Sequence, residues 1–242
     1  MTAAAPSAPR LAALRTRWLD AVTAGLRDDP SVAGAALVGS FGAGHADDWS
    51  DVDLLVVVSD ARLDGYAPPA PVEPVITIDA RHNGPRGTRG FSCQYVGDGL
   101  PLWADWYVHP VSLASWPSDC AVLFDRHGIE HGIEHGIEHG TLTLGEQLAA
   151  GEPEPPTPKG PDEERALKLG LVPVAGKGVA RRSPGAAGLI AFIGGSYDPD
   201  ATWEQQLAAL RRLLDDFAGL GPPDSVAAGH AYLDLVADAL SR

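Results

Sequence analysis

Residues 32–58 read VAGAALVGSFGAGHADDWSDVDLLVVV, and this stretch decides the fold. Its first part, Val32 to Val38, predicts a short strand that leads into the glycine-rich turn from Gly39 to Gly44. Its last part, Val52 to Val58, is apolar and rich in β-branched residues, which predicts a buried strand. The stretch therefore predicts two strands of one sheet, joined through a turn and a polar segment.

Two aspartates flank Val52 at the start of the second strand. Alternate side chains of a strand point to the same side, so Asp51 and Asp53 project together while Val52 turns into the core. Two adjacent carboxylates repel each other, and carboxylate oxygens are hard ligands that suit Mg²⁺. The pair therefore predicts a metal site.

The turn before the aspartates is suited to a phosphate group. Gly39 lets the backbone approach a phosphate closely, and Ser40 offers both an amide and a hydroxyl to phosphate oxygens. We expect a third carboxylate on a neighbouring strand, and Asp105 lies within a predicted strand from Pro101 to His109. Three carboxylates can hold two metal ions about 4 Å apart. Two other acids in predicted sheet regions are alternatives for the third ligand: Asp79 and Asp98.

A Gly-Ser turn, an Asp-x-Asp pair and a later acid on a strand together resemble the signature of the polymerase-β-like nucleotidyltransferase superfamily. The stretch GSFGAGHADDWSDVDLLVV carries this resemblance, which covers Gly39 to Val58. It implies that Asp51, Asp53 and Asp105 bind Mg²⁺ and catalyse transfer of a nucleoside monophosphate, most simply AMP from ATP. Gly39 and Ser40 would then bind the phosphates of the nucleotide.

The chain departs from this signature at one position. Many relatives carry Ala-Arg-Gly where this chain has Gly42-Ala43-Gly44, so the basic residue after the turn is missing. The resemblance implies that Lys177, in a later predicted helix, contacts the triphosphate; a solvated helix end with cations near the C-terminal dipole is the alternative. Other cations could also replace the missing charge: His45, Arg81, Arg86 and Arg89.

The rest of the chain divides into a sheet region and a helical region. Arg10 to Arg27 has apolar residues at helical spacing, which predicts an amphipathic helix. Further strands are expected at Val72 to Asp79, Phe91 to Val96 and Pro101 to His109. Further helices are expected at Thr141 to Ala150, Asp162 to Arg181, Ala201 to Phe217 and Ser225 to Leu240.

The segment from Gly151 to Pro161 is rich in proline and predicts a linker. We therefore expect an α+β protein, with a nucleotidyltransferase catalytic domain over residues 1–140 that contains a small mixed β-sheet, and an α-helical C-terminal domain over residues 141–242. Within the superfamily, this organisation looks most like the small-molecule branch, which includes the aminoglycoside adenylyltransferases and related antibiotic-resistance enzymes.

The charge indicates which partners suit the chain. Among 242 residues, 32 are acidic and 18 are basic, which gives a formal net charge of −14. Such a field repels nucleic acid and anionic membranes, so we expect neither as a partner. With the resemblance, it favours an NTP and a small hydroxylated, cationic acceptor. A protein acceptor, as in antitoxin-type relatives, and a catalytically silent nucleotide-binding module are the alternatives.

Several smaller features of the sequence bear on location, catalysis and local structure. Two cysteines without close spacing and the lack of a signal or spanning segment predict a cytoplasmic protein. The general base could be Asp105, or Glu163 or Glu164 at a helix start in the second domain. Asp47 to Trp49 predict the cap and first turn of a short helix. The repeated His-Gly-Ile-Glu segment that starts at His127 predicts a loop insertion, with a histidine metal site as the alternative.

Overall fold

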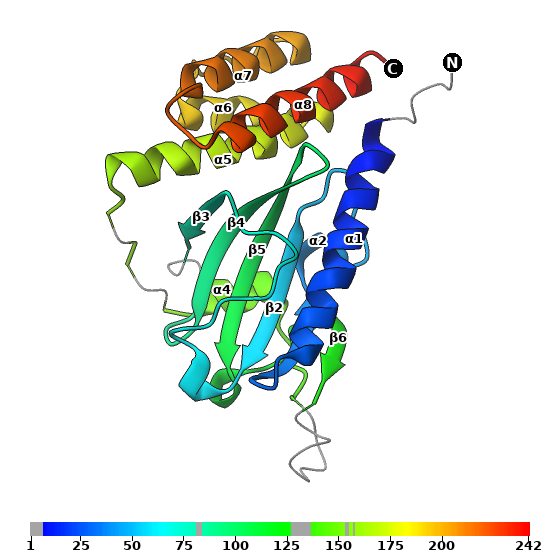
Figure 1. The fold of residues 1–242 in the computed structure, drawn as a ribbon, viewed down its shortest axis with the longest axis vertical. Coiled ribbons are helices and arrows are strands. Elements are labelled where there is room, and N and C mark those ends of the chain that lie inside the picture. Colours follow the sequence, from blue (N-terminus) through cyan, green and yellow to red (C-terminus); the bar gives the residue numbers. More distant parts are fainter. Residues whose placement is uncertain (1–6, 81–83, 127–136, 153–154, 157) are drawn as a thin grey trace.

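The computed structural model of the chain describes residues 7–80, 84–126, 137–152, 155–156 and 158–242. Over these ranges the N-terminal part forms a six-stranded sheet, and a stack of helices follows it (Figure 1). This arrangement confirms the predicted α+β class. No helix of the described ranges is both long enough and apolar enough to cross a bilayer.

The sheet has the strand order β3-β4-β5-β2-β1-β6. Strands β2 and β5 pair in parallel, whereas the other described neighbours pair antiparallel, so the sheet is mixed as predicted. The strands are β1 (Val32–Leu37), β2 (Val52–Val58), β3 (Ile76–Asp79), β4 (Arg89–Gly97), β5 (Leu100–Pro110) and β6 (Ala121–Asp125).

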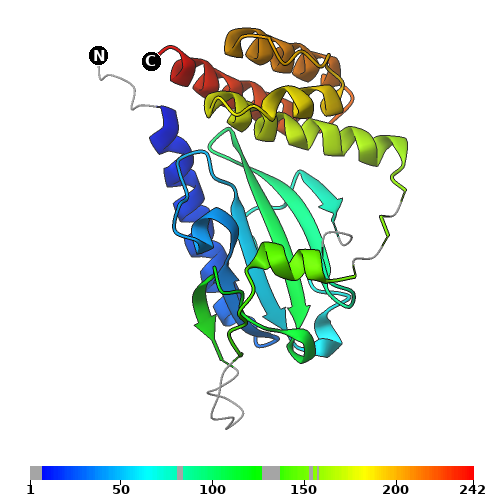
Figure 2. The ribbon, with the colours of Figure 1, turned by 180° about the vertical axis from the view of Figure 1, so that it is seen from behind.

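Two helices cover opposite faces of the sheet (Figures 1 and 2). Helix α1 (Ser7–Asp28) places Trp18 against Tyr95 and Trp106, with ring centroids 5.0 and 5.9 Å apart, which confirms the predicted amphipathic helix. On the other face, α4 (Leu144–Ala150) buries Leu144 in the same hydrophobic cluster as Leu55 of β2. Both faces of β2 are therefore covered, as its apolar sequence predicted.

The C-terminal helices stack at one end of the sheet (Figure 1). Helices α5 (Pro161–Ala180), α7 (Trp203–Phe217) and α8 (Pro223–Leu240) confirm the predicted positions within a few residues. Helix α6 (Ala186–Ile193) and strand β6 were not predicted. Leu169 and Val172 of α5 share a buried core with Leu102 of β5, so the helices pack directly on the sheet.

Two local predictions were wrong. The strand expected from Val72 begins only at Ile76, because Val72 is exposed and Pro74 has no N–H to donate to a neighbouring strand. Residues 47–49 form a turn instead of a helix: the Asp47 carboxylate accepts a hydrogen bond from the backbone N–H of Trp49, at 2.9 Å. An Asx turn of this kind competes with helix formation.

The structure does not test two further predictions, the domain boundary and the nature of the repeated segment. The division between residues 140 and 141 stays a prediction; α4 packs on the sheet, where its Leu144 N–H donates to the Asp119 carboxylate at 2.9 Å. Of the repeat histidines, His127, His131 and His135 lie outside the described residues, so neither reading of the repeat is resolved. The described end of the repeat contacts Trp116, whose backbone N–H donates to the Glu138 backbone carbonyl at 2.8 Å.

Candidate active site

The glycine-rich turn forms a single helical turn, α2 (Gly39–Gly42), at the end of β1. Gly39 has a φ of +58°, a conformation that favours glycine. A Cβ added to Gly39 would lie 2.8 Å from the Asp53 Cγ, so only glycine lets this backbone approach the carboxylate. A Cβ on Gly42 would similarly lie 2.6 Å from the Leu37 carbonyl oxygen. Gly39 therefore holds the turn tightly against β2, which carries Asp53, and Gly42 holds it against the end of β1.

The parallel pairing of β2 and β5 sets Asp53 directly opposite Asp105. Asp53 points to the face that α4 covers further along, because its neighbours Val52 and Leu54 belong to the core beneath α1. Asp51 lies one residue before β2, close enough that its charge contributes to the raised pKa of Asp53. Asp53 and Asp105 thus lie on adjacent strands, with Asp51 two residues before Asp53.

Burial and mutual repulsion dominate the electrostatics of this group. Burial, then the charges of Asp105 and Asp51, raise the pKa of Asp53 to about 7, against the opposing effect of Lys177. Burial also raises the pKa of Asp105, while a hydrogen bond from the Ser92 hydroxyl and one from the Trp103 Nε1, at 3.1 Å, work in the opposite direction.

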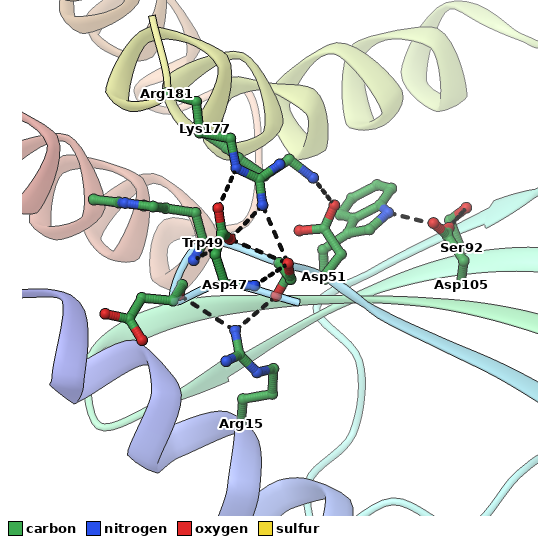
Figure 3. Close-up of polar contacts among 11 residues, drawn as sticks. Arg15, Asp47, Trp49, Asp51, Ser92, Asp105, Lys177 and Arg181 are labelled. Carbon is green, nitrogen blue, oxygen red and sulfur yellow. Dashed lines mark hydrogen bonds and ion pairs between the residues drawn. The ribbon is translucent and has the colours of Figure 1, made fainter. Parts of the chain in front are cut away.

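Lys177 reaches the site from the last turn of α5. Its ammonium pairs with the Asp51 carboxylate, and its side chain is only 17% exposed (Figure 3). The alternative of a solvated helix end is therefore wrong for Lys177, which faces the carboxylates. Whether it contacts a triphosphate stays a prediction.

Arg181, one helical turn beyond Lys177, was missed as a functional candidate. Its guanidinium donates two hydrogen bonds to the Asp47 carboxylate, from Nε to Oδ2 at 2.8 Å and from Nη2 to Oδ1. The same Nη2 also donates to the Ser50 hydroxyl at 3.1 Å. The signal available in the sequence was the spacing of four from Lys177, which places the two cations on one helix face.

Arg15 was also missed, and it approaches the same segment from α1 (Figure 3). Its Nη1 donates to the backbone carbonyls of Ser50, at 2.8 Å, and Asp48, at 3.2 Å. Its guanidinium lies 4.8 Å from the Phe41 ring centroid, so it also contacts the glycine-rich turn. The sequence holds no signal for this role, since an arginine on an amphipathic helix ordinarily faces solvent.

The other basic candidates make no described contact with the three carboxylates. Arg89 donates to the carbonyls of Leu63 and Tyr66, both at 2.9 Å, and it pairs with Val108 three residues beyond Asp105. Arg86 lines a cavity with His109. His45 is exposed just after the turn, and Arg81 lies outside the described residues.

The alternative acids are also placed apart. Asp98 is in the β4–β5 hairpin and pairs with Arg17, while Asp79 is on β3, which does not adjoin β5. Glu164 pairs with Lys168, at 2.7 Å, near the start of α5. Glu163 and Glu164 precede Lys177 by three to four helical turns, a separation of roughly 20 Å. They are remote from Asp51 along the helix.

The donor set fits a divalent cation. Three carboxylates supply hard oxygens, and within the described ranges no hydrogen bond to the Asp53 carboxylate is formed that would stabilise its charge. The side chains are not gathered for coordination, however: the described residues contain no group of three or more His, Cys, Asp or Glu side chains arranged to hold a metal ion. Asp51 is turned to Lys177, and Asp105 is turned to Ser92 and Trp103.

Part of the chain is similar to a known protein family. Residues 20–82 match the family model described as a nucleotidyltransferase domain. The matched range contains the glycine-rich turn, Asp51 and Asp53, and it supports the polymerase-β-like superfamily; Asp105 and Lys177 lie outside it. No curated protein matches the chain significantly.

Proposed function

From the presence of a nucleotidyltransferase domain, we propose that the chain is a Mg²⁺-dependent enzyme that transfers AMP from ATP to a hydroxyl of a small molecule. The observation that carries this proposal is the register of β2 and β5, which sets Asp53 opposite Asp105 beside the Gly39 turn. Acids on two adjacent strands next to a backbone that closely approaches one of them suit the transfer of a phosphoryl-containing group.

Each residue has a distinct task in this proposal. Gly39 and Ser40 bind the phosphates through the turn, Asp51 and Asp53 hold the metal, and Asp105 either completes the metal site or accepts the proton of the acceptor hydroxyl. When bound, Mg²⁺ supplies positive charge that offsets the charge of the triphosphate. Lys177 adds a cation near the same phosphates, which offsets the missing arginine at Ala43.

Asp105 is the proposed general base. Its raised pKa keeps it a better proton acceptor near neutral pH than an ordinary aspartate. The acceptor oxygen attacks the α-phosphorus in line, a new O–P bond forms, and the bond from the α-phosphorus to the bridging oxygen breaks. Pyrophosphate leaves with the bonding electrons, and the hydroxyl proton passes to the Asp105 carboxylate.

The acceptor is proposed from charge and organisation. A net charge of −14 favours a cationic molecule, and the helical C-terminal region is large enough to contribute a small-molecule pocket. An aminoglycoside-like antibiotic has both the positive charge and the hydroxyls, and a cytoplasmic resistance enzyme would act on it after uptake. The nucleotide and the acceptor are the two variables that the experiment must scan.

A pyrophosphate-release screen tests this proposal. Each NTP is combined with aminoglycosides, lincosamides and other hydroxylated metabolites in the presence of Mg²⁺. Asp53→Asn and Asp105→Asn should abolish any release, whereas Asp98→Asn, which changes an exposed acid in the β4–β5 hairpin, should retain it. Undiminished turnover in Asp53→Asn would refute the proposed chemistry. Labelled ATP that marks a protein in a lysate, with no small acceptor found, would instead identify a protein acceptor.

A further inference from the structure

The end of α5 meets the segment before β2 through two parallel ion pairs. Lys177 pairs with Asp51 and Arg181 pairs with Asp47, so residues four apart on the helix meet residues four apart in the segment (Figure 3). Spacing of four keeps Lys177 and Arg181 on one helix face. The two contacts therefore depend on the same placement of α5.

The two ion pairs differ in geometry. Arg181 grips Asp47 through both Nε and Nη2 and also donates to the Ser50 hydroxyl. Planar two-point contacts of this kind fix orientation as well as distance. Lys177, by contrast, contacts a single oxygen of the Asp51 carboxylate. The arginine contact is thus the anchor, and the lysine contact is the one that can be exchanged.

The partner of Arg181 is itself well held. The Asp47 carboxylate accepts the Trp49 N–H at 2.9 Å and the Ser50 hydroxyl at 3.1 Å, while Arg15 holds the Ser50 carbonyl from the other side. We call residues 47–50 the Asp47 turn. Because Asp51 follows it directly, the Asp47 turn fixes the backbone position from which the Asp51 side chain extends.

Lys177 forms an ion pair with Asp51, a carboxylate that the proposed function assigns to the metal. The positive charge of the Lys177 ammonium competes with a metal ion for the Asp51 carboxylate, and it neutralises the charge that would otherwise be buried beside Asp53. The described carboxylates are accordingly turned away from a common centre, with Asp51 directed to Lys177.

We propose that Arg181 is a positioning residue: it anchors α5 to the Asp47 turn and so sets the Lys177 ammonium on Asp51, where the ammonium holds the place of the metal. This inference rests on the proposed function in one respect, the assignment of Asp51 as a metal ligand. With a metal ion and its nucleotide bound, Asp51 would hold the metal, Lys177 would move from Asp51 to the phosphates, and the Arg181 contact would keep the helix in place.

Binding of Mn²⁺ alone, without nucleotide, tests the proposal through the signal of free Mn²⁺ in electron paramagnetic resonance. Lys177→Met should raise the affinity for Mn²⁺ roughly three- to tenfold, the effect of losing one partly buried ion pair. Arg181→Met should raise it in the same direction by a smaller factor, because Lys177 is then less well placed. The double variant should bind Mn²⁺ no more tightly than Lys177→Met.

A matched control separates positioning from charge. Arg182→Met removes the same charge from the next residue, which is exposed, and it should change the Mn²⁺ affinity less than Arg181→Met does. Asp47→Asn breaks the anchor from the other side and should reproduce the effect of Arg181→Met without altering any helix residue. Circular dichroism of each variant establishes that the helices remain folded.

Several outcomes would overturn the inference. Equal effects of Arg181→Met and Arg182→Met, or effects of Lys177→Met and Arg181→Met that add fully in the double variant, would show only a long-range charge effect. Unchanged Mn²⁺ affinity in Lys177→Met, or no Mn²⁺ binding to any variant, would also reject it. Failure of the proposed function would be seen in a different measurement. Pyrophosphate release would then be absent, even where the Mn²⁺ affinities shift as expected.

Discussion

Gly39 lies so close to the Asp53 carboxylate that a Cβ at Gly39 would be 2.8 Å from the Asp53 Cγ. The contact joins the proposed phosphate-binding turn to the proposed metal ligand. A change in one therefore displaces the other, although 14 positions separate them in the chain.

Gly39→Ala should consequently abolish nucleotidyl transfer and lower the free energy of unfolding by more than its backbone strain alone. Gly44→Ala is the matched control, because Gly44 also has a positive φ, of 73°, but nothing lies within 4 Å of its added Cβ. Strain at a positive φ costs about 1–2 kcal/mol in either variant. Chemical unfolding and pyrophosphate release measure the difference, and equal losses in the two variants would contradict the role of the Asp53 contact.

The pKa of Asp53 predicts how stability depends on pH. Its folded pKa is raised to about 7, above the value of an unfolded aspartate, so the folded state binds the proton more tightly. The resulting stability is present in full below about pH 4 and is lost as the pH rises through about 7. In metal-free buffer, the melting temperature of Asp53→Asn should fall less than that of the natural chain over this interval.

Addition of Mg²⁺ extends the same experiment. A metal ion replaces the proton as the neutralising partner, so it should raise the melting temperature of the natural chain at pH 8 and raise that of Asp53→Asn much less. Identical pH profiles for the two proteins would show that Asp53 does not carry the buried charge. Asp98→Asn is the control, as its acid is exposed in the β4–β5 hairpin.

Arg15 and Arg17 offer a matched pair on α1. Arg15 donates to the Ser50 and Asp48 carbonyls, whereas Arg17 forms a pair with Asp98 in which both side chains are more than half exposed, at 59% and 64%. Arg15→Met should destabilise the fold by about 1–3 kcal/mol, because hydrogen bonds from a charged group are lost at the Asp47 turn. Arg17→Met should cost about 0–1 kcal/mol. Urea unfolding at equal ionic strength compares them, and a larger loss in Arg17→Met would reverse the assignment.

Gly170 links helix α5 to Asp105 through the Trp103 side chain. A Cβ on Gly170 of α5 would lie 2.7 Å from the Trp103 ring, and the Trp103 indole donates to Asp105. Gly170→Ala should therefore destabilise the chain by about 1–3 kcal/mol despite the better helix propensity of alanine, and it should lower the transfer rate. Gly188→Ala in α6 meets nothing within 4 Å and should stabilise by up to about 1 kcal/mol. Thermal unfolding distinguishes them, since a stabilised Gly170→Ala would show that Trp103 moves freely.

Much of the fold was predictable because its signals are local. The apolar run from Val52 to Val58 matches β2 at both ends, and the periodic segments gave the long helices within a few residues. Strand β6 was missed because its first residues are exposed and it is stabilised by pairing with β1, which the sequence does not encode locally. Helix α6 was missed because its short, uniformly apolar run has no polar face to mark a helical period.

The sequence by itself determined the identity of the candidate site: a glycine turn that only glycine can adopt, and two aspartates whose alternation sets them on one side of a strand. The tertiary structure alone decided which acid lies opposite Asp53, because the register between β2 and β5 depends on pairing across distant segments. It also decided the cations. Arg15 and Arg181 come from helices far apart in the chain, and their contacts with the Asp47 turn depend on how those helices pack against the sheet, a relationship that no local pattern contains.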